Sequence, residues 1–333
     1  MGILTAKSHA LEHYTGKLGL PSHAGQYPLE RAEFGSSHFN APIMTARQSI
    51  KSLLRSLRST PAGIALNIPK RVAYALGYYV PKLGQIFRWG FGSREETNFT
   101  YDLSDDSLFY LAHTIAVVTD VDLETVRSYI IEAQTDTRLR ETVIAAVLSS
   151  QFKYVSDARC EFGRRLGWYA FVRILKPRVV VETGVDKGHG AILLCAALLR
   201  NRTEGALGKY YGTDINPEAG WLLRPPYSEV GTMLFGDSIQ SLTNFPQKID
   251  LFINDSDHSA DYEYREYRTV AEKLSEHAVV LGDNSHVTSM LAKFAAECGM
   301  RFLQFREVPR DHWYPGCGIG IAFPGASASR PRR

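Results

Sequence analysis

The sequence lacks acidic residues over a long stretch, since positions 34 to 94 contain no Asp or Glu but nine Lys or Arg. It has only four cysteines among its 333 residues, with no CxxC pair and no zinc-finger spacing. It also lacks a long apolar run, either as a signal peptide near the N-terminus or at transmembrane length elsewhere. These absences exclude a disulfide scaffold and a cysteine-rich zinc module, and they favour a cytoplasmic protein.

The basic stretch contains a predicted amphipathic helix over 46–59. Ile50, Leu53, Leu54 and Leu57 follow the i, i+3, i+4, i+7 spacing, and the basic residues fall mainly on the opposite side. This pattern is typical of a helix at an anionic membrane surface, and equally of a packing or oligomerisation helix. We therefore expect either peripheral membrane binding through 46–95 or a role in a homo-oligomer. Nucleic acid is not an expected partner, because no RNA-recognition fingerprint is visible.

The chain divides into four predicted parts. Residues 1–95 form a basic, partly irregular N-terminal region, residues 96–176 a helical cap region, residues 177–325 an α/β domain, and residues 326–333 a disordered tail. In the α/β domain, apolar strands such as RVVVETG and IDLFIND alternate with helices and end in a predicted hairpin. Such a pattern predicts a mostly parallel sheet covered by helices on both faces.

Polar residues follow the first three predicted strands, where ligands bind in open α/β sheets. The first strand runs into VETGVDKGHG, whose glycines permit a sharp turn before a helix N-terminus. This spacing differs from the G-x-G-x-x-G of dinucleotide folds, and its leading acid suits a ligand with a cationic amino acid group. Asp214 can accept hydrogen bonds from both ribose hydroxyls, and Asp237 with Ser238 can bond an adenine amino group.

On these motifs, residues 178–324 resemble a class I S-adenosylmethionine-dependent methyltransferase domain. The resemblance implies a Rossmann-like fold, with a seven-stranded mostly parallel sheet and a terminal antiparallel hairpin. It also implies S-adenosylmethionine as the methyl donor, with Asp214 at the ribose and Asp237 and Ser238 at the adenine. The residues it places around the methionine part are Glu182, Gly184, Asp186, Gly188 and Gly190.

The fourth and fifth strands end in a second set of polar residues, Asp255 and the pair Asp283–Asn284. A parallel sheet brings strand ends to one edge, and three oxygen ligands without a nearby thiol suit Mg²⁺ or a similar divalent cation. A coordinated metal lowers the pKa of a bound hydroxyl, and a neighbouring base removes its proton during attack. Asp257 and His258 are both candidates for that base.

The segment DSDHSADY, followed by GDN, resembles metal-dependent O-methyltransferases that act on sugar hydroxyls of macrolides and related natural products. The resemblance implies Asp255, Asp283 and Asn284 as metal ligands and leaves the base open. We favour His258 over Asp257 because imidazole titrates nearest to neutrality. The resulting hypothesis is a divalent-metal-dependent O-methyltransferase with a sugar or glycoconjugate acceptor. The alternatives are a metal-independent methyltransferase acting on RNA or another small molecule, and a catalytically inactive protein that binds the methyl donor.

Overall fold

The computed structural model describes residues 55–56, 60–96 and 99–325. Except for the helical pair Arg55 and Ser56, the helix predicted over 46–59 lies outside these ranges, as does the tail predicted over 326–333. The chain forms two units, Met1–Ile68 and Pro69–Arg333. In the described part of the first unit, helix α2 (Pro61–Leu66) begins after Thr60, whose side chain accepts a hydrogen bond from the Gly63 N–H at 3.1 Å.

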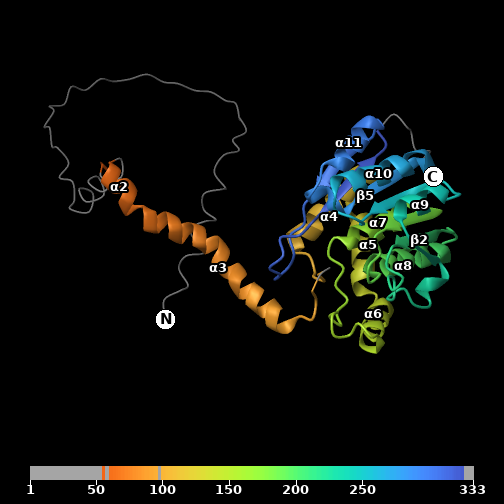
Figure 1. The fold of residues 1–333 in the computed structure, drawn as a ribbon, viewed down its shortest axis with the longest axis horizontal. Helices are drawn as coiled ribbons and strands as arrows, with labels where there is room; N and C mark the ends of the chain where they lie inside the picture. The colour runs from red at the N-terminus through yellow and green to blue at the C-terminus, as the bar shows by residue number, and fades with distance from the viewer. Residues whose placement is uncertain (1–54, 57–59, 97–98, 326–333) are drawn as a thin grey trace, which may run out of the picture. The chain divides into compact units, whose positions relative to one another are not determined.

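The second unit is built on one seven-stranded sheet with the strand order β3-β2-β1-β4-β5-β7-β6 (Figure 1). Strands β1 to β5 are parallel, β7 is antiparallel to β5, and β6 is antiparallel to β7. The strands are β1 (Val179–Thr183), β2 (Lys209–Asp214), β3 (Gly231–Phe235), β4 (Ile249–Asn254), β5 (Leu274–Gly282), β6 (Arg301–Phe305) and β7 (Ile319–Phe323). The predicted parallel sheet with a terminal hairpin is confirmed.

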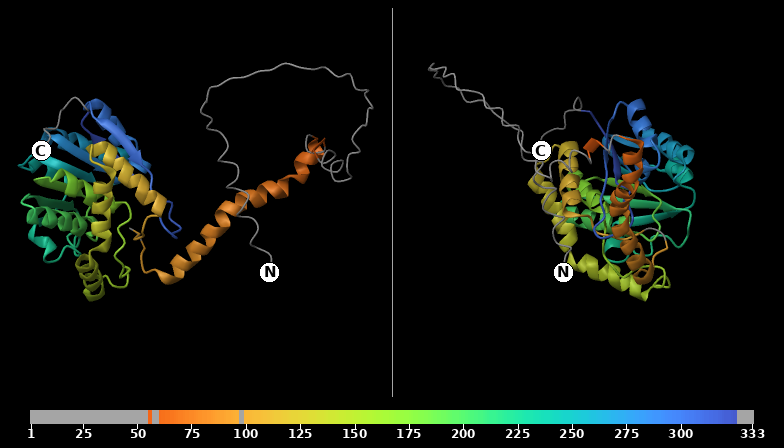
Figure 2. Two further views of the ribbon diagram at one scale, coloured as in Figure 1. Left: turned by 180° about the vertical axis from the view of Figure 1, so that it is seen from behind. Right: turned by 90° about the vertical axis from the view of Figure 1, so that its left-hand side faces the viewer.

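Helices cover both faces of the sheet, so the fold has three layers (Figures 1 and 2). Val180 of β1 belongs to one hydrophobic core, whereas Val179 and Val181 belong to the other, because successive side chains of a strand point to opposite faces. The first core includes side chains of α4 (Asp105–Thr119), α5 (Leu123–Thr135), α6 (Thr137–Ser149), α7 (Arg165–Leu175) and α8 (His189–Thr203). The second includes side chains of α9 (Ser238–Asn244), α10 (Ala260–Val270) and α11 (Met290–Glu297). Short 3₁₀ helices complete the fold: η1 (Tyr227–Glu229), η2 (Ala271–Lys273) and η3 (Asp283–His286).

The helices of the predicted cap region start where short polar residues occur in the sequence. Ser104, Asp122 and Asp136 are the N-caps of α4, α5 and α6, and each side chain accepts a hydrogen bond from a backbone N–H three residues later. Such caps satisfy N–H groups that have no partner inside the helix, and each typically contributes about 1 kcal/mol.

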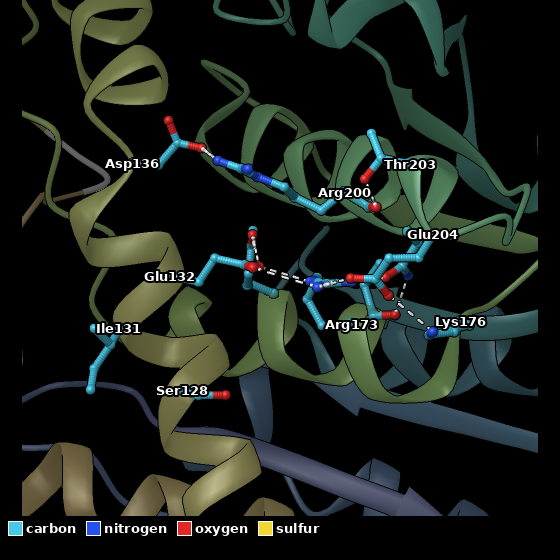
Figure 3. Close-up of polar contacts among 12 residues, drawn as sticks. Ser128, Ile131, Glu132, Asp136, Arg173, Lys176, Arg200, Thr203 and Glu204 are labelled. Carbon is cyan, nitrogen blue, oxygen red and sulfur yellow. Dashed lines mark hydrogen bonds and ion pairs between the residues drawn. The ribbon is translucent and has the colours of Figure 1, made fainter.

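A buried arginine joins helices α5, α7 and α8 (Figure 3). Arg173 of α7 donates from Nε to Glu132 Oε1 at 2.7 Å and from Nη2 to Glu204 Oε1 at 2.6 Å. Tyr169, also on α7, donates its hydroxyl to Glu132 at 2.6 Å. Because a buried charge without partners is costly, these contacts fix the position of α7, whose first residues reach the candidate site.

The sequence places an apolar, aromatic segment interrupted by Pro81 and several glycines after 46–59, and the structure shows it as one long helix, α3 (Ile68–Gly92). Trp89, near its C-terminal end, packs against Phe99 and Trp313, each with its ring centroid 5.3 Å from that of Trp89. The rings of Phe99 and Trp313 are 5.2 Å apart.

The sequence leaves two roles open for Trp313 and Tyr314, as a wall of the acceptor pocket or as loop packing. Both residues take part in the aromatic cluster around Phe99, in agreement with loop packing.

Candidate active site

A cavity of about 470 Å³ opens at the carboxyl ends of β1 to β4. Among the residues predicted for the site, Gly188, Asp283 and Asn284 are absent from its lining, and all the others contribute to it. These are Glu182, Gly184, Asp186, Gly190, Asp214, Asp237, Ser238, Asp255, Asp257 and His258. The residues predicted to bind the methyl donor and the candidate bases follow different strands in the sequence, and here they line the same cavity.

The loop after β1 passes very close to the loop after β4. Gly184 has φ +79°, and a Cβ at this position would lie 2.0 Å from the carbonyl oxygen of Asp255. Gly188, with φ +97°, is the N-cap of α8. Since L side chains rarely adopt positive φ, glycine at these positions permits both the turn and the close approach.

Asp214 connects the loops that follow β1 and β2. Its Oδ2 accepts from the Asp186 N–H, and its Oδ1 accepts from the Asn216 N–H, both at 2.8 Å. Each carboxylate oxygen has further acceptor capacity, so these bonds leave room for the predicted ribose contact. Asp214 thus shapes the donor side of the cavity in addition to its predicted binding role.

Glu182 is almost completely buried at the end of β1, under the first turn of α8. The Tyr210 hydroxyl donates to its Oε2 at 2.5 Å, and a Cβ at Gly190 would lie 2.3 Å from its Oε1. Burial raises the pKa of Glu182 from 4.5 to about 7, although the Tyr210 hydrogen bond and the charge of Arg165 act in the opposite direction. At neutral pH this acid is therefore poised between its neutral and charged forms.

The raised pKa predicts that a Glu182→Gln variant changes the pH dependence of stability. Between its unfolded pKa near 4.5 and its folded pKa of about 7, Glu182 holds its proton in the folded state after the unfolded chain has released it. Its contribution to the free energy of unfolding is therefore present below pH 4.5 and is lost as the pH rises through 7, by about 3 kcal/mol. Urea unfolding of the donor-free protein at pH 4.5 and pH 8 should show the variant gaining stability relative to wild type at pH 8. Parallel pH curves for the two proteins would rule the explanation out.

The predicted adenine-side residues have structural partners of their own. Asp237 is the N-cap of α9 and accepts from the Gln240 N–H at 2.8 Å. The Tyr262 hydroxyl donates to the second oxygen of Asp237 at 3.0 Å and lies 2.9 Å from the Ser238 hydroxyl. Tyr262 also lines the cavity, although it is not among the residues predicted from the sequence. The only feature of the sequence that points to Tyr262 is that it is an aromatic residue just after the segment DSDHSA.

A buried carboxylate, Glu266 of α10, lies behind this wall. It accepts hydrogen bonds from Ser238, from Asn254 Nδ2 at 2.5 Å and from Ser256 Oγ at 2.5 Å. Burial raises its pKa in spite of these bonds. Glu266 therefore ties the loop after β3 to the loop after β4, on which the candidate base lies.

The two candidate bases have different surroundings. Asp257 Oδ1 accepts from the Ser259 N–H at 2.6 Å, and hydrogen bonds from Ser259 lower the pKa of Asp257. A carboxylate stabilised in this way is a weaker proton acceptor. Ser259 occupies the N-cap of α10, as its position predicts, but makes no side-chain cap bond. Asp257 therefore organises the turn, and His258 is an exposed side chain at the cavity.

Asp255 and Asp283 meet at the sheet edge, as predicted, but each also faces an arginine. The buried Arg164 donates from Nη2 to Asp283 Oδ2 at 2.6 Å and from Nε to Asp283 Oδ1. Arg165 Nη2 lies 3.7 Å from Asp255 Oδ2. Burial and the neighbouring Asp283 raise the pKa of Asp255 well above its usual range, whereas Arg164 lowers that of Asp283 against the effect of burial.

These contacts do not fit the predicted Mg²⁺ site. Both oxygens of Asp283 are engaged by one guanidinium and a second lies beside Asp255, so an incoming divalent cation would meet two positive charges. The side chain of the third predicted ligand, Asn284, lies outside the described residues.

The two arginines are not predicted as site residues because they precede the first strand, in the segment EFGRRLGWYAF. Arg164 is the N-cap residue of α7, and its Nη1 also donates to the Tyr101 hydroxyl at 3.1 Å and to Glu307 Oε1 at 3.4 Å. The feature of the sequence that could have indicated them is a pair of charged residues in an otherwise apolar helical segment. Such a pair requires buried partners, but the sequence does not identify them.

Residues 181–285 match the model of a family described as a methyltransferase domain. Similar solved structures include a candidate O-methyltransferase from Klebsiella pneumoniae, with 15% identity, 59% of this chain and 94% of that chain covered, and a TM-score of 0.41. The O-methyltransferase TomG from Streptomyces achromogenes, involved in tomaymycin synthesis and solved with S-adenosylmethionine, has 15% identity, coverages of 57% and 91%, and a TM-score of 0.38. An O-methyltransferase from Bacillus cereus has 10% identity, coverages of 66% and 99%, and a TM-score of 0.35. No curated protein matches the chain in sequence.

The strand order is that of the class I methyltransferase fold, and it carries the fold assignment at these low identities. The match over 181–285 covers β1, β2, β3, β4 and β5 and the loops that line the cavity. Together they support a Rossmann-like methyltransferase domain in this part of the chain.

Proposed function

We propose that this protein transfers the methyl group of S-adenosylmethionine to a hydroxyl group, with His258 as the general base. The observation that carries the proposal is the single cavity, which brings Asp214 and Asp237 on the donor side together with His258. A donor and an acceptor bound in such a space need only in-line placement for the methyl group to move.

Each step can be assigned to a residue of the cavity. The acceptor oxygen attacks the methyl carbon as the carbon–sulfur bond breaks, and S-adenosylhomocysteine leaves. His258 takes the hydroxyl proton on a ring nitrogen during the attack. Arg165, which lines the same cavity beside Asp255, supplies a fixed positive charge near the developing oxygen anion.

Mg²⁺, which the sequence-based hypothesis includes, has no role in the proposed mechanism. Since Arg164 already pairs with Asp283 and Arg165 lies beside Asp255, we assign no step to Mg²⁺. A sugar or glycoconjugate acceptor remains part of the proposal. It is supported by the polar groups at the base side of the cavity, Asp255, Ser256, Asp257 and His258, which can bond several hydroxyls of one ring.

Calorimetry with S-adenosylmethionine and S-adenosylhomocysteine tests the donor site first, and absence of binding would overturn the whole proposal. Labelled methyl donor is then incubated with fractionated oligosaccharides and glycolipids, with EDTA in one arm and added Mg²⁺ in the other. We expect transfer at equal rates, within about twofold, in both arms, because Asp283 is paired with Arg164 and Arg165 lies beside Asp255.

Two other results of this assay would contradict the proposal. Loss of transfer in EDTA with recovery on adding Mg²⁺ would overturn the assignment to the arginines and favour a site at Asp255, Asp283 and Asn284. Donor binding without transfer to any fraction would instead favour the catalytically inactive binding protein.

A further inference from the structure

Helix α3 exposes an apolar face along its length. None of its residues is buried, and Phe87 and Phe91 are 62% and 90% exposed. The members of this α3 apolar face are Val72, Leu76, Tyr79, Val80, Leu83, Ile86, Phe87 and Phe91, all of them exposed. A row of large apolar side chains in water is unfavourable, so such a face points to a binding surface.

The apolar and basic residues of α3 lie on opposite sides. At about 100° per residue, the α3 apolar face spans an arc of roughly 140°, and Lys70, Arg71, Lys82 and Arg88 all fall on the other arc. The helix contains no acidic residue, so its four cations have no acidic partner within the helix. An ordinary solvated helix would carry charges of both signs in i, i+4 pairs.

Trp89 attaches the end of α3 to the rest of its unit from the side opposite the α3 apolar face. Trp89 lies on the basic side of the helix and contacts Phe99 and Trp313, both with ring centroids 5.3 Å away. The end of the helix is therefore attached through one side, while the α3 apolar face on the other side stays exposed.

We propose that α3 binds in the interface of an anionic membrane. The α3 apolar face would enter the acyl boundary, and the four cations would contact anionic headgroups. Tyr79, with an apolar ring and a polar hydroxyl, suits the headgroup level. Charge complementarity favours lipid over a second copy of this chain, because a second α3 would add four more cations without an acid.

No helix in the described ranges combines the length and the apolarity of a membrane span.

Flotation of the full-length chain with vesicles tests this inference. We expect the protein to float with phosphatidylcholine–phosphatidylglycerol vesicles at low salt and to remain behind with phosphatidylcholine alone. Replacing Leu76, Leu83 and Phe87 together by Gln should lower the partition coefficient by at least about 100-fold, because each change removes several buried methylene equivalents. The matched control, Tyr74→Gln with Tyr78→Gln on the other side of the helix, should change it by less than about tenfold.

Thermal unfolding and donor binding check that the variants fold. Because the substituted side chains are exposed, we expect the unfolding temperature and the donor affinity to stay unchanged. Equal flotation of the triple variant and wild type would overturn the proposal, as would failure of the wild type to float with anionic vesicles. If the triple variant instead changes only the sedimentation behaviour of the free protein, the α3 apolar face binds a second copy, and the membrane proposal is wrong.

Discussion

Replacing His258 by alanine lowers kcat for methyl transfer by about 100- to 1,000-fold, the usual contribution of a general base. The imidazole faces the cavity from the loop after β4 and has no assigned role in binding the donor. The affinity for S-adenosylmethionine should therefore change by less than about threefold, so the loss appears in the chemical step. Single-turnover measurements with labelled donor separate the two effects.

The matched control for this experiment is Asp257→Asn. Asparagine retains the oxygen that accepts from the Ser259 N–H, so the turn into α10 is preserved while the carboxylate is removed. We expect a loss of less than about fivefold in kcat, since Asp257 is a structural acceptor and a weak base. The reverse ranking, with Asp257→Asn inactive and His258→Ala active, would identify Asp257 as the base.

Replacing Gly184 by alanine should abolish donor binding and destabilise the protein by about 3 kcal/mol or more, because strain and steric overlap add. The added Cβ would lie 2.0 Å from the Asp255 carbonyl oxygen, in a backbone conformation with φ +79°. The nearest atoms belong to the backbone of Asp255 and Ser256 and not to a movable side chain, so the loops after β1 and β4 must separate. Calorimetry with S-adenosylmethionine and urea unfolding measure the two losses.

Gly205→Ala is the control for backbone strain alone. Gly205 has φ +85°, close to that of Gly184, but a Cβ there would meet no atom within 4 Å. It should cost only about 1–2 kcal/mol and leave donor binding intact. Equal effects of the two substitutions on stability and on donor binding would show that the close approach of the two loops does not add to the effect of backbone strain.

The sequence was sufficient to predict the sheet and the positions of the strand-end residues. Apolar strands alternating with helices define a parallel sheet, and a parallel sheet necessarily collects residues such as Asp214 and Asp255 at one edge. The glycine loop was predictable for the same reason, since positive φ and close approach demand glycine. Local chemistry and topology together therefore located the cavity.

The partners of the strand-end acids could not be predicted in this way. Arg164 and Asp283 are 119 residues apart in sequence, and their contact depends on how α7 packs against the sheet. A carboxylate at a strand end has the same appearance in sequence whether its counter-ion is a metal or a guanidinium. The predicted Mg²⁺ site was therefore reasonable from residue types, and the buried arginine is what argues against it.

Glu266 has a further consequence for how the site opens. Its carboxylate accepts bonds from Ser238 on one side and from Asn254 and Ser256 on the other, so neither loop can leave without exposing a buried acid. Local unfolding in proteins proceeds in cooperative groups of residues. The adenine-side loop and the loop that carries His258 should therefore open as one such group, with a single free energy of opening.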